Sequence, residues 1–277
     1  MNNLDFVFWG TPKVASETLE ILKNNGYIPS LIVSAPDKPV GRKMIVTPPP
    51  VKIWAKENDI LCIQPEKLDK EFTNKLREKN FDLSIVVAYG KIMPEEILNL
   101  PEMGSINIHF SLLPKYRGAS PVESAILNGE EKTGVSIQKM EYKMDSGPII
   151  AMEETKIDKN EKAEELKTRL TYIGGNLLTR TIPEFISGKI QPIPQEENEA
   201  TFSKKIKKED GLIDLEENPI KNYNKFRAYA KWPRTFFFKD GKRIIITKAK
   251  LENEKFIIEK VIPEGKKEVS FTDVGHL

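Results

Sequence analysis

The stretch Ser105-Ile-Asn-Ile-His-Phe-Ser-Leu-Leu-Pro-Lys-Tyr-Arg-Gly-Ala-Ser-Pro121 decides the fold. Its first six residues alternate between polar and apolar, which predicts a strand with Ile106 and Ile108 on one face. Asn107 and His109 then share the other face, and the Leu-Pro and Arg-Gly steps end the regular pattern. Polar side chains at the carboxyl end of a strand are typical of the ligand-binding edge of an α/β sheet.

Asn107 and His109 interrupt an otherwise apolar strand, which is costly unless both side chains find partners. Both side chains can be structural, with hydrogen-bond partners inside the protein, or both can be catalytic. A third polar group, Asp145, precedes Gly147 in a predicted turn. A carboxylate can hold an imidazole in one tautomer and stabilise its protonated form, so the three residues are a candidate catalytic set. From the residues alone, both interpretations stay open.

The surrounding sequence predicts an α/β domain over residues 1–187. Residues 4–9, 12–25 and 28–33 read as strand, helix and strand, which is a βαβ unit of a parallel sheet. Gly10 follows the first strand without the G-x-G-x-x-G pattern, which argues against a nicotinamide-dependent enzyme. Further strands are expected at 60–63, 82–88, 134–140 and 148–153. Further helices are expected at 51–58, 69–79, 121–127 and 161–187, with Pro183 kinking or ending the last one.

A second, smaller domain is predicted over residues 203–277, after a linker at 188–202 that is rich in Pro, Gln and Glu. A helix is expected over residues 218–230. Two β-rich runs, 235–238 and 243–247, flank Asp240-Gly241, which is a hairpin signal. Short strands with basic side chains favour a small β-barrel of the oligonucleotide-binding (OB-like) type.

The charge of the chain is small but uneven. The net charge is +2, yet residues 203–277 hold 18 Lys/Arg against 12 Asp/Glu, a net of +6. The first 202 residues hold 25 against 29, a net of −4. This asymmetry favours an anionic partner for the C-terminal domain, or else it is a solvated lysine-rich surface.

Other site classes find little support in the sequence. Cys62, the single cysteine, lies in an apolar run and is expected to be a buried strand residue. The sequence offers no His/Cys cluster with metal-ligand spacing, so no metal is expected. It also lacks a signal peptide pattern and an apolar run long enough to cross a membrane, so we expect a cytoplasmic protein without membrane contact.

The patterns Asn-x-His, Ser-Leu-Leu-Pro-x-x-Arg-Gly and Asp-x-Gly resemble those of the folate-dependent formyltransferases, and of the methionyl-tRNA formyltransferases in particular. The resemblance implies a Rossmann-like, mostly parallel sheet with helices on both faces. It implies 10-formyltetrahydrofolate as formyl donor, initiator methionyl-tRNA as acceptor, and no metal. Asn107, His109 and Asp145 fall on the family's catalytic positions. We expect the enzyme to be a monomer.

The resemblance also implies two kinds of binding segment. The residues expected at the folate are Ser111, Leu112, Leu113 and Pro114, together with Val87, Ala88, Tyr89 and Gly90. The loop over residues 34–51 holds five prolines and resembles the family's tRNA-contacting loop, with Lys38, Arg42 and Lys43 as its basic residues. Simpler interpretations are an ordinary strand-to-helix turn at Gly90 and a rigid structural loop at 34–51.

Some positions depart from the family pattern. Lys13 and Val14 stand where most members carry an acidic and an aromatic residue, which bears on the methionine pocket. The C-terminal domain, at about 75 residues, is shorter than usual. Rival interpretations are an amino-sugar nucleotide N-formyltransferase, a glycinamide ribonucleotide formyltransferase, a folate-deformylating hydrolase, and a non-catalytic RNA-binding protein. The basic loop and the Lys231-Trp-Pro233 segment favour the tRNA enzyme, and a glycinamide ribonucleotide formyltransferase would usually lack the C-terminal domain.

Overall fold

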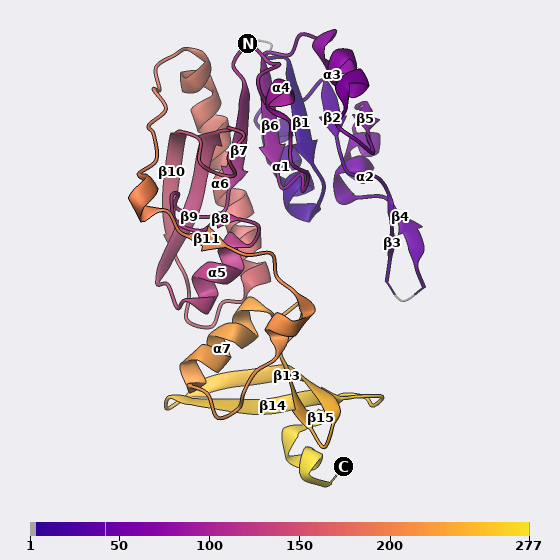
Figure 1. Ribbon diagram of the computed structural model, residues 1–277, viewed down its shortest axis with the longest axis vertical. Helices are drawn as coiled ribbons and strands as arrows, with labels where there is room; N and C mark the ends of the chain where they lie inside the picture. Colours follow the sequence, from indigo (N-terminus) through magenta and orange to yellow (C-terminus); the bar gives the residue numbers. More distant parts are fainter. Residues whose placement is uncertain (1–3, 42, 277) are drawn as a thin grey trace. The chain divides into compact units, whose positions relative to one another are not determined.

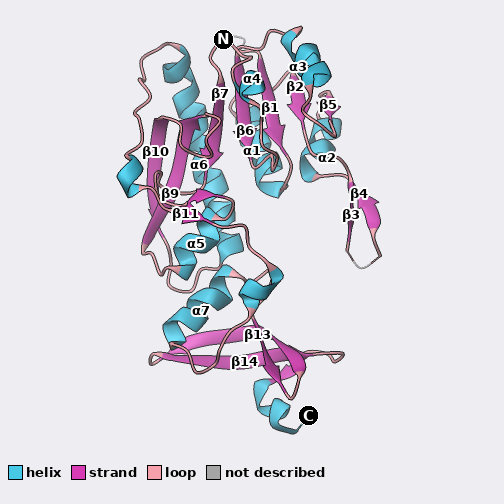
Figure 2. Cartoon of the chain, in the orientation of Figure 1, coloured by secondary structure: helices cyan, strands magenta, loops and turns pink. Residues whose placement is uncertain are grey.

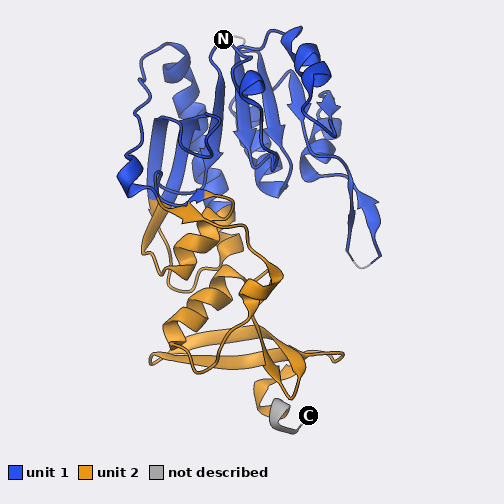
Figure 3. Cartoon of the chain, viewed as in Figure 1, with its two compact units in different colours: residues 1–117, 134–154, 168–200 blue, residues 118–133, 155–167, 201–277 orange. Residues whose placement is uncertain are grey.

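The structure is a computed structural model that describes residues 4–41 and 43–276. The chain forms two compact units (Figure 3). The first consists of residues 1–117, 134–154 and 168–200, and the second of residues 118–133, 155–167 and 201–277. The second unit therefore draws two segments from before residue 187. The linear boundaries at 187 and 203 stay a prediction.

The first unit is built on a seven-stranded sheet in the order β10-β9-β7-β6-β1-β2-β5 (Figure 1). β1 pairs in parallel with β2 and β6, and β6 pairs in parallel with β7. β7 and β9 are antiparallel, so the sheet is mostly parallel, as predicted. Its strands are β1 (Phe6–Gly10), β2 (Leu31–Val33), β5 (Cys62–Ile63), β6 (Leu83–Val87), β7 (Ser105–His109), β9 (Lys132–Lys139) and β10 (Ile149–Lys156).

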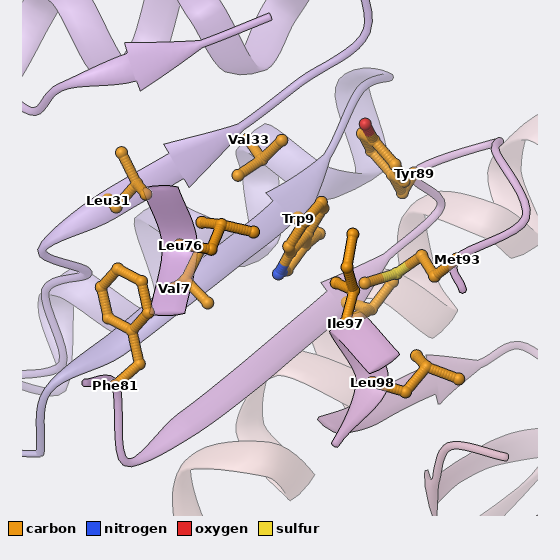
Figure 4. Close-up of a cluster of buried hydrophobic side chains, with 11 residues drawn as sticks. Val7, Trp9, Leu31, Val33, Leu76, Phe81, Tyr89, Met93, Ile97 and Leu98 are labelled. Carbon is orange, nitrogen blue, oxygen red and sulfur yellow. The ribbon is translucent and has the colours of Figure 1, made fainter. Parts of the chain in front are cut away.

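Helices cover both faces of this sheet, which is why all five residues of β1 are buried (Figure 2). On one face, Val7 and Trp9 pack in a cluster with Leu76 of α3 and with Ile97 and Leu98 of α4 (Figure 4). The described helices are α1 (Lys13–Asn24), α2 (Pro50–Glu57), α3 (Lys70–Arg77), α4 (Glu95–Leu98), α5 (Pro121–Leu127), α6 (Ala163–Ile186) and α7 (Pro219–Ala228), with 3-10 turns η1 (Glu197–Glu199), η2 (Lys208–Gly211) and η3 (Phe271–His276).

On the other face, α6 packs closely against the sheet through Gly174 and against α1 through Gly175. A Cβ atom added at Gly174 would lie 3.0 Å from methyl carbons of Ile108 and Val135. One added at Gly175 would lie 2.8 Å from Ile21 of α1. The glycines that weaken the helix by propensity thus permit its close packing.

The sequence predicts that Pro183 kinks or ends this helix. The helix does not end there, because α6 continues to Ile186. Proline removes one backbone donor and its ring crowds the preceding turn. The Ser187 amide still donates to the Pro183 carbonyl at 3.1 Å. The helical pattern therefore resumes directly after the proline.

The proline-rich segment after β2 differs from the predicted loop. It contains two short antiparallel strands, β3 (Lys38–Val40) and β4 (Ile45–Thr47), which form a ribbon separate from the main sheet (Figure 1). Pro39 lies opposite Val46 in this ribbon. A two-stranded ribbon consists of two edge strands, the one place in a sheet where proline is tolerated.

The C-terminal part of the second unit is a small strand domain, as predicted. Its antiparallel sheet has the order β12-β13-β14-β15. The predicted hairpin is confirmed, because Lys239 pairs with Lys242 across the turn, and Asp240 and Gly241 both have positive φ, 50° and 74°. The strands are β12 (Phe236–Lys239), β13 (Lys242–Glu252), β14 (Lys255–Pro263) and β15 (Val269–Ser270), and β8 (Arg117–Gly118) pairs with β11 (Phe202–Ser203).

The core of this domain lies between the sheet and α7. Tyr223 and Phe226 of α7 pack with Phe237, Ile244 and Val261 of the strands. Burial raises the pKa of the Tyr223 hydroxyl. Within the described residues, no helix is both long and apolar enough to cross a bilayer.

Candidate active site

The site is built on the polar face of β7. Asn107 lies opposite Val86 of β6 and Gln138 of β9, while His109 lies opposite Ser136 of β9. Asn107 and His109 are 9% and 6% exposed. The alternation predicted from the sequence is confirmed here, because Ile106 and Ile108 are buried and Ile108 faces α6.

The tautomer of His109 follows from its hydrogen bond to the main chain. Its Nε2 lies 2.9 Å from the carbonyl oxygen of Tyr116. A carbonyl oxygen only accepts, so Nε2 carries the proton and Nδ1 of the neutral ring carries a lone pair. His109 Nδ1 lies 3.7 Å from Oδ1 of Asp145, which is an ion-pair distance for the protonated ring. The Tyr116 carbonyl therefore orients the imidazole, and Asp145 faces the nitrogen that can take up a proton.

Asp145 lies in a turn that is held from several sides. Its φ is +51°, a conformation that residues with side chains rarely adopt. Gly147 makes the turn sterically possible, because a Cβ atom there would lie 1.8 Å from the Lys139 carbonyl oxygen. The Gln138 side chain donates a hydrogen bond to Asp145 Oδ1 at 3.0 Å. The carboxylate is thus fixed beside His109 by a neighbouring strand.

Asn107 is the polar side chain that the protein leaves available. Within the described part of the chain, its amide has no hydrogen-bond partner. Its polar atoms are not among the fully buried side-chain atoms that lack a partner, so they remain accessible to a ligand. The Asn107 and His109 side chains project from the same face, two residues apart.

The segment Ser111–Pro114 is pinned onto β9. The Ser136 hydroxyl donates to the Ser111 carbonyl at 2.7 Å and accepts from the Leu113 amide at 3.0 Å. Ser111 is itself fully buried, and its hydroxyl donates to the Lys115 carbonyl at 2.6 Å. Of the four residues predicted at the folate, Leu112 and Pro114 are half-buried and reach the surface, whereas Ser111 and Leu113 are buried.

The segment Val87–Gly90 begins with the last residue of β6, at the same edge of the sheet. Ala88 and Gly90 are exposed and have positive φ, 48° and 83°. The Tyr89 side chain points instead into the core, edge-on to Trp9 with ring centroids 5.2 Å apart (Figure 4). Burial raises the pKa of Tyr89 to about 12. This segment therefore offers main-chain groups to a ligand.

Comparison with known proteins assigns the family. The family described as Formyl transferase matches residues 3–182. The family described as Formyl transferase, C-terminal domain, matches residues 205–266. The chain belongs to the formyl transferase family. A protein of Caldicellulosiruptor saccharolyticus named methionyl-tRNA formyltransferase is 39% identical over 256 residues, which is 90% of this formyltransferase and 82% of that protein.

Solved structures share the fold of this formyltransferase. A methionyl-tRNA formyltransferase from Clostridium thermocellum matches with a TM-score of 0.64 at 19% identity, covering 96% of this chain and 99% of that one. An N-formyltransferase from Helicobacter canadensis, in complex with folinic acid and dTDP-3-aminofucose, matches with a TM-score of 0.69 at 20% identity, covering 96% and 98%. At such identities these matches establish the architecture of the formyltransferase.

Of the basic residues predicted to contact tRNA, Lys38 begins β3 and Lys43 lies between β3 and β4 of the formyltransferase. Lys38 and Lys43 are exposed, and Arg42 lies outside the described residues. The root of the ribbon is anchored by Asp37, which accepts hydrogen bonds from Lys52 at 2.8 Å and from Gln64 at 2.8 Å. These bonds, the one from Lys52 first, lower the pKa of Asp37.

Sequence reasoning missed three supporting residues of this formyltransferase: Tyr116 and Gln138, which bond His109 and Asp145, and Ser136, which holds Ser111 and Leu113. Tyr116 acts through its main chain, which no residue pattern reveals. Gln138 was detectable in principle, because β9 alternates and its polar positions, Ser136 and Gln138, face Asn107 and His109. Among the described residues, no cluster of three or more His, Cys, Asp or Glu side chains could hold a metal ion.

Proposed function

We propose that this formyltransferase moves the formyl group of 10-formyltetrahydrofolate to the α-amino group of methionine on initiator methionyl-tRNA. The observation that carries the proposal is the pairing of an available amide, Asn107, with an imidazole whose Nδ1 faces Asp145. Relatives at 38% and 39% identity over most of the chain, all named methionyl-tRNA formyltransferase, support the choice of acceptor.

The chemistry follows from the geometry of the three side chains. The folate donor supplies an activated formyl group. Attack by the acceptor amine places negative charge on the formyl oxygen, and the Asn107 amide can donate a hydrogen bond to that charge. The His109 Nδ1 lone pair can accept the proton that the amine loses. The resulting imidazolium, stabilised by the Asp145 carboxylate at 3.7 Å, can return that proton to N10 of tetrahydrofolate as the bond from N10 to the formyl carbon breaks.

The folate would be held at the edge where β6 and β7 end. The exposed main chain of Ala88 and Gly90 and the half-buried side chains of Leu112 and Pro114 provide hydrogen-bonding groups beside apolar surface. Ser111 and Leu113 contribute indirectly, because their hydrogen bonds fix the segment. The Tyr89 side chain supports this edge from within the core.

The tRNA would contact the β3–β4 ribbon and the C-terminal domain. Lys38, Arg42 and Lys43 supply positive charge to the ribbon, and residues 203–277 carry a net charge of +6. In the C-terminal domain, Lys208, Phe236, Phe238 and Arg243 line a shallow, open pocket, and the Arg243 guanidinium lies 3.7 Å from the centroid of the Phe236 ring. Its acceptor is a translation substrate, so we also propose that the enzyme acts in the cytoplasm. We further propose that it acts as a monomer.

The decisive experiment compares acceptors. The purified chain is incubated with 10-formyltetrahydrofolate and with initiator methionyl-tRNA, uncharged initiator tRNA, or a dTDP-linked amino sugar. We expect formylmethionyl-tRNA from the first mixture and no product from the others. Formylation of the amino sugar in place of methionyl-tRNA would overturn the proposed acceptor and leave the family assignment intact.

A further inference from the structure

The segment predicted as a plain linker, 188–202, contacts the turn that carries Asp145. The Gln195 Nε2 donates its two shorter hydrogen bonds to the Asp145 carbonyl at 2.9 Å and to the Gly147 carbonyl at 2.7 Å, with a longer one to Gln138 Oε1 at 3.4 Å. Nearby, Ile193 and Ile149 exchange two main-chain hydrogen bonds of 2.8 Å. Gln195 therefore bridges both sides of the tight turn at Ser146.

The orientation of the Gln195 amide is set by a buried charge. Arg117 is fully buried, and its Nε donates to Gln195 Oε1 at 3.0 Å. An arginine only donates, so the amide oxygen faces Arg117 and both amide hydrogens face the two carbonyls. Glu197 completes the arrangement by accepting from Arg117 Nη1 at 2.9 Å and from Lys143 at 2.7 Å. These two bonds, the one from Lys143 first, lower the pKa of Glu197.

The turn is thus held at two levels. Gln195 holds its main chain, and Gln138 holds the Asp145 carboxylate through a 3.0 Å bond to Oδ1. A residue with φ of +51° is strained and persists where its surroundings over-determine it. The two glutamine amides provide that over-determination. Moving the turn would carry Asp145 away from His109 Nδ1.

We infer that Gln195 is a positioning residue for the proposed reaction: it holds the 145–147 turn so that the Asp145 carboxylate faces the proton-accepting nitrogen of His109. The expected fall in kcat rests on the proposed function. The expected displacement of Asp145 from His109 rests on the structure alone. It assigns a role in the active site to a segment between the two family domains, which end and begin at residues 182 and 205.

The kinetic test uses full-length variants. Gln195→Glu keeps the volume and an acceptor for Arg117 but presents a carboxylate oxygen to two carbonyls. We expect Gln195→Glu and Gln195→Ala to lower kcat roughly 10–100-fold, since small displacements of catalytic groups cost up to ~10²-fold, with KM for folate and tRNA near that of the parent. Gln191→Ala is the matched control and should match the parent, because the side chain of this exposed glutamine donates to the nearby Gly188 carbonyl at 3.1 Å, away from the turn.

A second readout separates this inference from the proposed function. The chain has two histidines, so the ring NMR signals of His109 can be assigned by substituting one of them. We expect both Gln195 variants to shift the His109 ring signals and to speed hydrogen exchange of the 145–147 amides, with an unfolding transition as cooperative as that of the parent. Gln195→Asn, too short to reach both carbonyls, serves if Gln195→Ala does not fold.

The outcomes are distinguishable. If the parent does not formylate methionyl-tRNA but the Gln195 variants show the NMR changes, the proposed function is overturned and the positioning role stands. A Gln195→Glu variant with the parent's kcat and unchanged His109 signals would overturn the positioning role. A variant that raises KM and leaves kcat alone would also overturn it, because Gln195 would then act in binding.

Discussion

Two regions follow carboxyl ends of strands in the same sheet, yet they are built in opposite ways. Around β7, two of the candidate side chains are held by hydrogen bonds: the buried His109 to the Tyr116 carbonyl and the half-buried Asp145 to Gln138. In the β3–β4 ribbon, all six strand residues are exposed. Transfer of a small group requires the reacting atoms to be held within a fraction of an ångström, whereas contact with a large substrate requires a segment that extends away from the sheet. Substitutions in the two regions should therefore affect different steps.

The largest effect is expected at His109. His109→Ala removes the proposed proton acceptor and should lower the formylation rate by on the order of 10²–10⁴. Single-turnover formylation of methionyl-tRNA measures this, and folate affinity should stay near that of the parent. A variant that reacts at the parent's rate would remove the imidazole from the mechanism.

Asn107 should follow closely. Asn107→Ala removes a donor to the developing negative charge and should lower the rate by roughly 10²–10³. Asn107→Asp keeps the shape but replaces the donor with a negative charge, so it should be at least as impaired. Both variants should unfold at the parent's temperature, since Asn107 makes no side-chain hydrogen bond to the described residues. Equal rates for Asn107→Asp and the parent would rule out the oxyanion role.

The ribbon should affect tRNA use alone. Replacing Lys38, Arg42 and Lys43 with Ala should raise KM for methionyl-tRNA by roughly tenfold, about 1.4 kcal/mol, and leave kcat and folate affinity unchanged. Lys70→Ala with Lys79→Ala is the matched control, because both lysines are exposed, one in α3 and one just after it. If control and ribbon variants behave alike, the ribbon is only structural.

The C-terminal domain should contribute through charge. Lys204, Lys205 and Lys208 are exposed, and replacing them with Ala should weaken tRNA binding and flatten its dependence on salt. Each lost phosphate contact should change the log–log slope by about 0.7–0.9. Binding titrations at several salt concentrations test this in the full chain, and an unchanged slope would count against phosphate contacts. Substitution is a better test than truncation, because residues 118–133 and 155–167 belong to the same compact unit.

The smallest effect concerns the root of the ribbon. The pKa of Asp37 is lowered by hydrogen bonds from Lys52 and Gln64, so its stabilising contribution is present above the ordinary value of 3.8 and is lost as pH falls through the lowered one. Asp37→Asn should therefore be less stable than the parent near neutral pH, and the difference should shrink below about pH 4. Denaturant unfolding at several pH values measures it, and a pH-independent difference would contradict the ion pair.

Where a local pattern suffices, the sequence predicts the structure well. The predicted helix at 121–127 has the observed bounds, and the Asp240-Gly241 hairpin is recognisable from its turn. Alternation along 105–110 correctly separates Asn107 and His109 from the apolar face. Whether these residues and Asp145 perform catalysis stays a prediction.

What the sequence leaves hidden depends on distant or main-chain partners. Gln195 lies 50 residues from Asp145 in the sequence. No local pattern predicts that a glutamine in a linker donates hydrogen bonds to two main-chain carbonyls. The prolines of the ribbon favour a loop by pattern, but Pro39 is compatible with a strand whose edge is free. By helix propensity, the two glycines of α6 only weaken the helix. The structure shows that they leave room for Ile108 and Ile21.

The hydrogen bond from His109 to the Tyr116 carbonyl has a consequence for how this site tolerates change. The acceptor belongs to the main chain, so replacing the amino acid at position 116 does not delete it. What a substitution there can disturb is the positive φ of 60°, a conformation that glycine and asparagine adopt with the least strain. The tautomer is therefore encoded in the path of the backbone, where it is insulated from most single mutations. Residues around it can vary while the proton stays on the same nitrogen.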